Sequence, residues 1–569
     1  MPGIFGTTYE RGEEEIAKRD LYKMCELLKH ESFYRKDLDY IGARVACSRI
    51  HLGKISPIAM PVSSGAVKVW LDGEIYDCSL PIERYGGSTG TNHIELIGAI
   101  YSEAMKSNQG WGFLQGLSGE FSMVILDEER DTLHLITDRM ASRQLFYFFD
   151  NKNLSWAQEI KAFLEIAKFQ AIMSRETAEE FLSSGYLSDN KTWFENVYRI
   201  PGSTVITFDL RSRSLIQRKY WDWQTVEPLR GPLDVREVVD EVSRLFHDAV
   251  YRRVKGKLSV GVPLSGGLDS RLILASIPDE YSDHITAYTF GKSGCDDVSV
   301  AKRVARKMGR EHLVFELNSS NWLDNRIRGV WLTDGLLDLL HMHGIEFMAD
   351  VRKNADVVLS GIIGGGLIGG GFLHDKDMTE IEVVEKRIVG RSVMGVALEG
   401  HFIDQRLPFF DNRLNEFIIS IPPALRIRGK VYHKLLLTKF PDYFKAIPYA
   451  DWGCAISYPR FIAWHYRVLR KAERFAYRKF PVLLKSPKVS MHDYPRWIRM
   501  PPARQVFVNI LMSENAIFPD FFQKDKCMAL LEEHMKAKCD NSSVLCRILT
   551  LELWLQQVYK NRYRSQCNE

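Results

Sequence analysis

The sequence lacks the features of a membrane-inserted or secreted protein. None of its apolar runs reaches the roughly 18–20 residues that a membrane-spanning helix needs. The N-terminal segment MPGIFGTTYERGEEE has neither the basic region nor the apolar region of a signal peptide. The 9 cysteines form no CxxC pair and no metal-ligand spacing, so we expect reduced thiols rather than a disulfide or zinc framework. We therefore expect a cytoplasmic protein with no membrane partner.

A large excess of charge is missing as well. The 76 Lys and Arg residues face 72 Asp and Glu residues, and a net charge of +4 gives no general attraction to nucleic acid. Residues 460–504 are an exception, because 12 Lys and Arg residues stand there against Glu473 and Asp493, with aromatic residues between them. We interpret this stretch as a basic helical face or a docking site for an acidic or peptide partner, and we expect no nucleic-acid partner.

The length and the pattern of the chain predict two domains. A chain of 569 residues exceeds one comfortable hydrophobic core. Up to about residue 165, short alternating runs such as Val67–Asp77 and Phe121–Asp138 predict antiparallel strands, with a helix near His93–Lys106. From about residue 235, strands and helices alternate, which predicts a parallel, doubly wound sheet, and the chain after Asp375 reads as mostly helical. We assign residues 1–205 to the first domain, 206–234 to a connector and 235–569 to the second domain.

The strongest motif is Leu264-Ser265-Gly266-Gly267-Leu268-Asp269-Ser270, which lies between a predicted strand and a predicted helix. Ligands of open parallel sheets bind at the carboxyl ends of the strands, and a helix N-terminus attracts phosphate. Glycines allow close approach of the backbone, serine hydroxyls donate hydrogen bonds, and Asp269 can hold Mg²⁺ between phosphate oxygens. The motif is neither a Walker A loop nor a dinucleotide fingerprint, so it predicts a different kind of phosphate site.

This loop resembles the pyrophosphatase loop of the N-type ATP pyrophosphatases, and nearly the whole chain resembles the asparagine synthetase family. Landmarks of that family occur here in the expected order. They are Gly3-Ile4-Phe5-Gly6, Asp72-Gly73-Glu74-Ile75-Tyr76, Leu117-Ser118-Gly119-Glu120-Phe121, Asp138-Arg139, Gln158-Glu159-Ile160, Tyr198-Arg199-Ile200-Pro201-Gly202, Leu359-Ser360-Gly361 and Arg406-Leu407-Pro408-Phe409-Phe410-Asp411. The resemblance implies a mixed α+β and α/β protein, with an N-terminal glutaminase-like β-sandwich of the Ntn type followed by a parallel-sheet ATP pyrophosphatase domain.

For the second domain, the resemblance implies ATP and Mg²⁺ as cofactors and a reaction in two steps. A carboxylate attacks ATP to form an acyl-adenylate and pyrophosphate, and an amine then displaces AMP. By position, Ser265, Gly266, Gly267, Asp269 and Ser270 would bind the pyrophosphate, with Asp269 on the metal. Leu264, Phe290, Ser360 and Gly361 would surround the adenosine. Asp296 or Asp297 matches an acidic position of the family, or caps a helix. Lys434 matches a basic catalytic position, whereas the family's second lysine is absent and Lys439 or Lys445 could substitute for it.

The first domain departs from the family at its catalytic residue. The glutaminase nucleophile is an N-terminal cysteine, and position 2 here is Pro2, which has no nucleophilic side chain. Asp72 stands in place of an oxyanion-stabilising asparagine, and a carboxylate would repel an oxyanion. Arg49 remains where the family binds the glutamine carboxylate. We expect no glutamine hydrolysis, and we read Cys47 and Cys78 as packing residues.

The second domain departs after Ser360-Gly361, where the family carries two acids. Here the chain reads Ile362-Ile363-Gly364-Gly365-Gly366, so both acids are replaced by glycine. One interpretation is a reshaped phosphate or substrate loop rich in backbone N–H donors. The other is the loss of one Mg²⁺ ligand, which leaves a weak or inactive ligase.

Three functions remain open from the sequence. The first is a ligase that amidates a carboxylate with free ammonia. The second is a cyclase of a peptide or amino acid, similar to the β-lactam synthetases and lasso-peptide cyclases, which also lack the cysteine. The third is a catalytically silent scaffold that binds nucleotide. We expect a small-molecule or peptide carboxylate as substrate, and a homodimer is compatible with the sequence.

Overall fold

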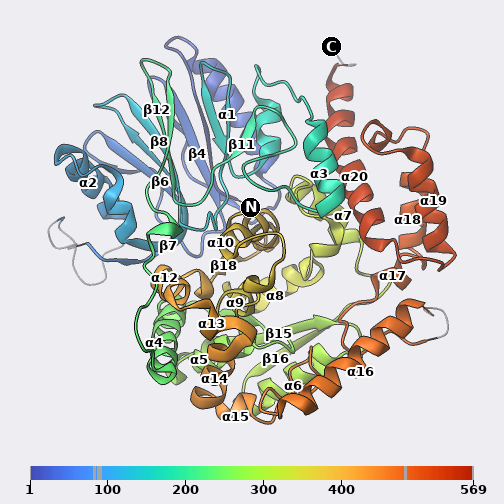
Figure 1. The fold of residues 1–569 in the computed structure, drawn as a ribbon. Helices are drawn as coiled ribbons and strands as arrows, with labels where there is room; N and C mark the ends of the chain where they lie inside the picture. Colours follow the sequence, from blue (N-terminus) through green and yellow to red (C-terminus); the bar gives the residue numbers. More distant parts are fainter. Residues whose placement is uncertain (1, 81–84, 86–92, 480–483, 567–569) are drawn as a thin grey trace.

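The computed structural model describes residues 2–80, 85, 93–479 and 484–566. The N-terminal part forms a β-sandwich in the upper half of Figure 1, and the parallel sheet of the C-terminal part lies in the lower half. The last helices of the chain, drawn in red, stand beside the sandwich at the upper right. No helix within the described residues is long and apolar enough to cross a membrane.

The first sheet of the sandwich contains seven strands, all paired antiparallel. Its order is β11-β9-β10-β1-β4-β2, and β3 pairs with β4 outside this path. The strands are β1 (Ile4–Thr8), β2 (Arg35–Lys36), β3 (Tyr40–Ile41), β4 (Val45–His51), β9 (Phe146–Phe149), β10 (Leu154–Ala157) and β11 (Val197–Arg199). Strand β1 lies between β10 and β4, so the N-terminal residues are fixed in the interior of the sheet.

The second sheet has six antiparallel strands in the order β13-β12-β8-β7-β6-β5. They are β5 (Val62–Ser64), β6 (Val67–Cys78), β7 (Leu117–Asp127), β8 (Thr132–Thr137), β12 (Thr204–Asp209) and β13 (Leu215–Lys219). Part of the predicted connector, residues 206–219, therefore contributes to this sheet through β12 and β13. Helix α1 (Glu14–Leu28) packs against β4 of the first sheet and α2 (His93–Lys106) against β6 of the second, so a helix covers each outer face.

The C-terminal part contains a five-stranded sheet with the order β16-β15-β14-β17-β18, in which every pair is parallel. Its strands are β14 (Val260–Pro263), β15 (Ile285–Gly291), β16 (Glu311–Glu316), β17 (Val357–Leu359) and β18 (Asp404–Arg406). The chain adds β15 and β16 on one side of β14 and then β17 and β18 on the other side. The carboxyl end of β14 is therefore a topological switch point. Ligands bind at such points in open α/β sheets.

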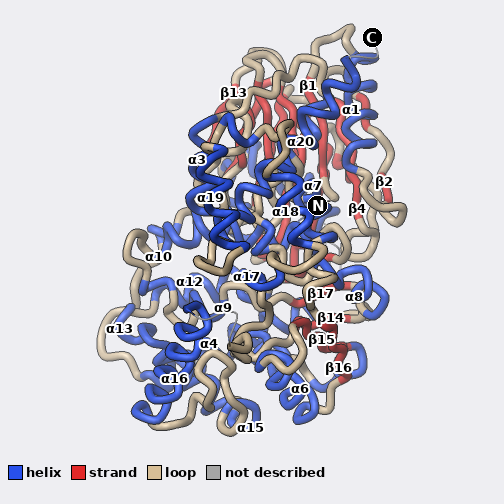
Figure 2. Tube along the Cα trace, turned by 90° about the vertical axis from the view of Figure 1, so that its right-hand side faces the viewer, coloured by secondary structure: helices blue, strands red, loops and turns tan. Residues whose placement is uncertain are grey.

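Helices account for the rest of the C-terminal part. Those next to the sheet in sequence are α4 (Val235–Val254), α5 (Asp269–Ser276), α6 (Asp296–Met308), α7 (Asp324–Leu332), α8 (Met348–Asn354), α9 (Gly364–Leu367), α10 (Glu380–Glu382) and α11 (Val393–Glu399). The later ones are α12 (Asn412–Ser420), α13 (Pro423–Arg426), α14 (Lys430–Lys439), α15 (Pro441–Phe444), α16 (Arg460–Lys479), α17 (Tyr494–Trp497), α18 (Ala503–Leu511), α19 (Lys524–Met535) and α20 (Ser542–Gln566). Figure 2 shows the strands gathered in two regions with helices around both.

The predicted fold class is confirmed: an antiparallel sandwich precedes a parallel sheet. The two runs within Phe121–Asp138 pair as β7 and β8, and the helix near His93–Lys106 is α2. The sequence did not predict β18, which follows a mostly helical stretch. This strand has only three residues, all buried, so it shows no alternation of polar and apolar side chains.

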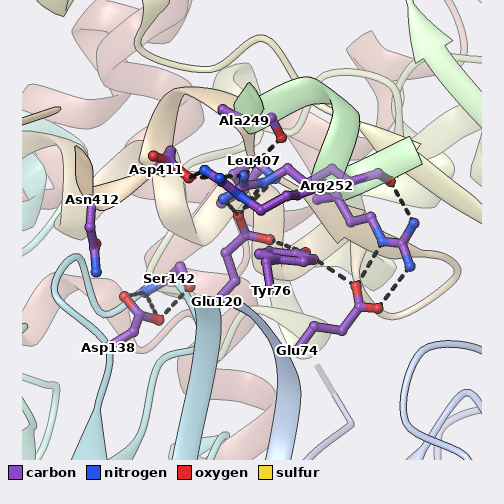
Figure 3. Close-up of polar contacts among 12 residues, drawn as sticks. Glu74, Tyr76, Glu120, Asp138, Ser142, Ala249, Arg252, Leu407, Asp411 and Asn412 are labelled. Atoms are coloured by element: carbon purple, nitrogen blue, oxygen red, sulfur yellow. Dashed lines mark hydrogen bonds and ion pairs between the residues drawn. The ribbon is translucent and has the colours of Figure 1, made fainter. Parts of the chain in front are cut away.

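Buried ion pairs join the two domains at their centre (Figure 3). Neighbouring strands β6 and β7 place Glu74 opposite Glu120. Glu120 Oε1 accepts hydrogen bonds from Arg253 Nε at 2.9 Å and Nη2 at 2.8 Å, and from the Leu407 backbone N–H at 3.1 Å. Glu74 accepts two bonds of 2.7 Å from Arg406. Each carboxylate of the first domain is thus matched by an arginine of the second, which fixes the relative orientation of the domains.

A second buried polar cluster crosses the interface. Lys161 contacts both Glu159 and, at 3.0 Å, Asp334 of the second domain. Glu159 also receives His30 Nε2 at 2.7 Å and lies near His401. His30, Glu159 and His401 have the spacing of a metal site, but the Lys161 ammonium already supplies the positive charge that this carboxylate needs.

Removing the Glu120 carboxylate should destabilise both domains together. Glu120→Ala leaves Arg253 with the longer contact to Asp411 at 3.5 Å as its acidic partner in the interior, and the loss of one partner of a buried pair costs up to about 3–5 kcal/mol in the free energy of unfolding. Glu241→Ala is the matched control, because its partner Arg244 lies with it on an exposed face of α4 and such pairs contribute below about 1 kcal/mol. Denaturant unfolding followed by tryptophan fluorescence measures both. A loss below about 1 kcal/mol for Glu120→Ala would show that this ion pair does not hold the domains.

Glu399 at the end of α11 provides a pH-dependent test. Burial raises the pKa of its carboxyl from 4.5 to about 8. The folded form therefore holds its proton above the pH at which the unfolded chain loses it, so stability falls as the pH rises from about 4.5 to about 8. Glu399→Gln removes this titration, and the variant should gain on the order of 1–3 kcal/mol over the parent at pH 9, but little at pH 4.5. Melting temperatures of the parent and of Glu399→Gln at both pH values measure this, with Glu237→Gln at an exposed position of α4 as the control. The prediction is refuted if Glu399→Gln differs from the parent by the same amount at both pH values.

Candidate active site

The predicted phosphate loop connects β14 to α5 at the switch point of the parallel sheet. Hydrogen bonds within the loop fix its shape: Ser265 N–H donates to Ser270 Oγ at 3.1 Å and Gly267 N–H to Ser265 Oγ at 3.1 Å. Gly266 N–H donates to Asp297 Oδ1 at 2.9 Å, and its carbonyl accepts from Ala450 N–H at 3.0 Å. A side chain at Gly266 would come within 2.4 Å of Ala450 Cβ, so this position requires glycine.

Asp269 is the first residue of α5, and two neighbours orient its carboxylate. Tyr432 OH donates to Oδ1 at 2.7 Å, and the Gly365 N–H donates to Oδ2 at 2.7 Å. Burial raises the pKa of Asp269, while these two hydrogen bonds act in the opposite direction. The carboxylate keeps lone pairs that point toward no protein donor, so it can still accept a cation.

A cleft of about 1630 Å³ opens in front of this loop. Predicted site residues that line it are Ser265, Gly267, Asp269, Ser270, Ser360 and Gly361, together with Asp297. Loops after β14 and β17 supply most of these residues, and these two strands are neighbours, which explains why positions far apart in sequence meet.

The other predicted residues lie near the cleft without lining it. Leu264 and Gly266 are buried, and the Leu264 backbone N–H donates to the Tyr288 carbonyl in the middle of β15. Phe290 is close to the end of β15 and packs near Phe347, at a ring distance of 6.2 Å. These three positions support the loop or stand beside it, and their role toward adenosine stays a prediction.

The basic residues of the cleft differ from the predicted ones. Lys434 lies on α14 directly after His433, which lines the cleft, but Lys434 itself is not among the lining residues. Lys439 pairs with Asp240 on α4 at 2.7 Å, and Lys445 also lies outside the lining. Positive charge in the cleft comes instead from Arg428, Lys430, Arg460 and Arg467. The catalytic role of Lys434 stays a prediction.

Three contributors to the site were not predicted. Arg428 has a left-handed backbone with φ of 58°, an uncommon conformation for a residue other than glycine, and its side chain lines the cleft. Arg271 lies beneath the loop and donates to the carbonyls of Gly266 and Pro448, and burial lowers its pKa to about 10. Tyr432 orients Asp269, as described above. Of the three, only Arg271 could have been suspected from the sequence, because it directly follows the loop motif.

The glycine run after β17 lies against Asp269. Ile363, with φ of 66°, precedes the short helix α9, which begins at Gly364. A Cβ at Gly364 would lie 2.6 Å from Phe409 and 2.7 Å from Asp269 Cγ, whereas a Cβ at Gly365 would lie 3.4 Å from Asp269 Oδ2, an ordinary contact. Gly365 therefore has space for a side chain, and that side chain would stand beside the Asp269 carboxylate.

The corresponding pocket of the first domain is almost closed. Pro2, Asp72, Arg143 and Asp404 line a space of only about 10 Å³, about the size of one water molecule. Arg143 fills it with an ion pair to Asp72 at 3.6 Å and to Asp404 of the second domain at 3.3 Å.

Arg49 is no longer available for a ligand. Its guanidinium is fully buried, and Nε donates to Asp37 Oδ2 at 2.7 Å. The two remaining nitrogens donate to the Leu71 carbonyl at 2.9 Å and the Ile58 carbonyl at 2.8 Å, among others. Cys47 is buried in the core, and burial raises the pKa of its thiol, while Cys78 packs at the edge of the same core.

Comparison with known proteins gives a separate match for each of the two parts of the chain. The family model for a glutamine amidotransferase domain matches residues 1–221, and the model for asparagine synthase matches residues 241–394. The chain is similar to the asparagine synthetase family in both parts. The two matches follow the order of that family, an amidotransferase domain before the synthetase domain.

Individual relatives in this family are distant. A putative glutamine-hydrolysing asparagine synthetase of Methanocaldococcus jannaschii is 24% identical over 51% of this chain and 56% of its own length. Amidase chry2 of Gibberella zeae is 27% identical over 56% of this chain and 52% of its own length, and asparagine synthetase B of Escherichia coli is 23% identical over 57% and 55%. The chain thus spans about half the length of the curated relatives it matches. Among solved structures, a glutamine phosphoribosylpyrophosphate amidotransferase from B. subtilis overlaps 55% of this chain and 90% of its own, with 8% identity and a TM-score of 0.27.

Substitutions in the glycine run test what this asparagine synthetase homologue has lost. Gly365→Asp adds a carboxylate beside Asp269, and because Mg²⁺ prefers oxygen ligands, ATP should bind more tightly with Mg²⁺ and more weakly without it. Gly365→Ala adds the same Cβ without charge and should change the affinity less than about twofold, whereas Gly364→Ala should weaken binding because its Cβ has no space. Calorimetric titration over a range of Mg²⁺ concentrations measures all three. If Gly365→Ala also abolishes binding, the loop requires glycine because ATP contacts its backbone, and the loss of a metal ligand is not what distinguishes it.

Proposed function

We propose that the protein is an AMP-forming carbon–nitrogen ligase of the cytoplasm that adenylates a carboxylate and forms an amide without hydrolysing glutamine. The contrast between the two sites carries this proposal. The cleft of the second domain measures about 1630 Å³ around the phosphate loop, whereas the space lined by Pro2 and Asp72 in the first domain measures only about 10 Å³ and is bordered by an ion pair.

In this proposal the loop residues Ser265, Gly267 and Ser270 bind the phosphates, with Gly266 setting the backbone path. Ser360 and Gly361 line the cleft at the neighbouring strand end, where they would contact the adenosine, and Leu264 would support the loop from behind. Asp269 and Asp297 offer carboxylate oxygens in the cleft, which is the donor type that Mg²⁺ prefers, so the residues present fit this ion. Bound Mg²⁺ would neutralise phosphate charge.

The chemistry requires two displacements. A carboxylate oxygen of the substrate attacks the α-phosphorus of ATP, and pyrophosphate leaves with the electrons of the broken P–O bond. A neutral amine then attacks the acyl carbon, AMP leaves, and the extra proton of the nitrogen passes to a base or to water. Arg428 and Lys430, which line the cleft, and Lys434 farther along α14 would stabilise the negative charge that develops in the first step.

A cyclase of a peptide or amino acid is the second candidate, and the size of the cleft favours it. Pockets for single small ligands span about 300–1000 Å³, so the cleft leaves room for a substrate larger than a simple amino acid beside ATP. The intact, hydrogen-bonded loop fits both a ligase and a silent scaffold that binds nucleotide, so pyrophosphate release is the measurement that separates them.

Pyrophosphate release tests the proposal. Purified protein with ATP, Mg²⁺ and a panel of small and peptide carboxylates should release pyrophosphate with one class of carboxylate, and ammonia or a substrate amine should convert the adenylate to an amide. Asp269→Ala should lower the rate about 10²–10³-fold, the effect of losing one electrostatic group in the site. Glutamine should yield no glutamate above background, because Pro2 offers no nucleophile. Glutamate formation that Arg143→Ala enhances, or the absence of pyrophosphate release from every carboxylate, would overturn the proposal.

A further inference from the structure

Helix α16 (Arg460–Lys479) exposes an unusual number of large apolar side chains. The exposed fractions are 73% for Phe461, 64% for Trp464, 41% for Val468 and 64% for Phe475. Single exposed apolar residues are common on protein surfaces, but a row of them on one helix marks a surface that another phase or molecule covers. Figure 1 shows α16 along the lower right edge of the molecule.

The four residues form one continuous stripe. At about 100° per residue, positions 461, 464, 468 and 475 lie within about 60° of one another, over about 21 Å of helix. Ala463 and Tyr477 are buried on the opposite side, and Arg470 fixes that side through an ion pair with Asp296 at 2.5 Å. The protein therefore holds the helix by one face and presents the apolar face outward.

A basic row runs along one side of the stripe. Arg460, Arg467, Lys471 and Arg474 are all exposed and fall between the stripe and the buried face. Glu473 is the only acidic residue of this helix. A helix with aromatic and aliphatic residues on one face and Arg and Lys beside them is typical of helices that lie in the interface of a bilayer.

We infer that α16 attaches the protein peripherally to an anionic lipid surface. A peptide that docks as a helix or strand would use a groove or a free sheet edge, whereas Val468 and Phe475 of the stripe lie outside the cleft lining and project from the helix surface. The charges favour anionic lipid, since four exposed cations border the apolar side chains. Such attachment requires no membrane-spanning helix. It changes the expectation of no membrane partner into a narrower one, that no helix of the described residues crosses a membrane.

Attachment through α16 would place the cleft at the lipid surface. Arg460, Phe461, Trp464 and Arg467 belong to this helix and also line the cleft that contains the phosphate loop. A carboxylate located at the headgroup level could enter the cleft without leaving the interface. Lipid binding itself requires neither ATP nor an active ligase, so its test is independent of the proposed function.

Cosedimentation of the full chain with vesicles tests the inference. We expect binding to phosphatidylcholine vesicles that contain phosphatidylglycerol, weaker binding to phosphatidylcholine alone, and a decrease with added salt. The double variant Val468→Ser/Phe475→Ser avoids the residues that line the cleft and should lower the partition coefficient at least about tenfold. Lys471→Glu should lower it at least about fivefold.

Two matched variants control for unspecific effects. Leu38→Ser removes a side chain that is 87% exposed on the first domain, and Arg236→Glu reverses an exposed charge on α4, and both should bind vesicles like the parent. Unchanged melting temperature shows that the double variant is folded. The inference is overturned if the parent does not bind anionic vesicles at low salt, or if Leu38→Ser is as harmful as the double variant. It is also overturned if ultracentrifugation shows that the stripe mediates self-association while vesicle binding is unaffected.

Discussion

The buried Glu120–Arg253 contact is the constraint on which the arrangement of the two domains depends. Glu120 stands on β7 of the sandwich, and its carboxylate also receives the Leu407 backbone N–H and Tyr76 OH. Because both charges are removed from water, neither can be left alone without a large cost. The position of β18, the strand that precedes Leu407, is thereby tied to the sandwich, and β18 in turn borders β17 at the phosphate site.

The proposed loss of glutaminase chemistry rests on several residues that lie together in the first domain. Pro2 offers no side-chain nucleophile, and Arg143 pairs with the Asp72 carboxylate and with Asp404. Because Asp404 belongs to the second domain, the narrow space that these residues line is part of the domain interface. The first domain thus contributes buried contacts to the second, and this gives a physical reason for its retention.

Much of the fold could be predicted from the sequence, because alternating strands, a strand–loop–helix motif and the helical pattern each have a local signal. Asp269 and the serines of the loop were found for the same reason. Tyr432 and Arg428 could not be found this way, since their roles depend on α14 folding back over the loop and on a left-handed backbone at Arg428. Strand β18 was missed because three buried residues have no periodicity. Lys434 shows why a position in the sequence does not fix where a side chain points. It directly follows His433, which lines the cleft, but neighbouring side chains on a helix differ in direction by about 100°.

The last helix has a consequence for synthesis of the protein. Helix α20 packs on α3 (Arg175–Ser184) of the first domain and on α7 of the second. Arg547 donates to the Leu182 carbonyl at 3.3 Å, and Thr550 Oγ1 accepts from the Leu339 N–H at 3.1 Å. A growing chain leaves the ribosome N-terminus first, so the sandwich can form while α20 is still unmade. Until then, the apolar surfaces of α3 and α7 that α20 covers remain open to water and to other chains. A chain that ended before residue 542 would therefore retain the phosphate loop but expose the apolar surfaces of α3 and α7. Chaperones or proteases would be expected to bind such a product.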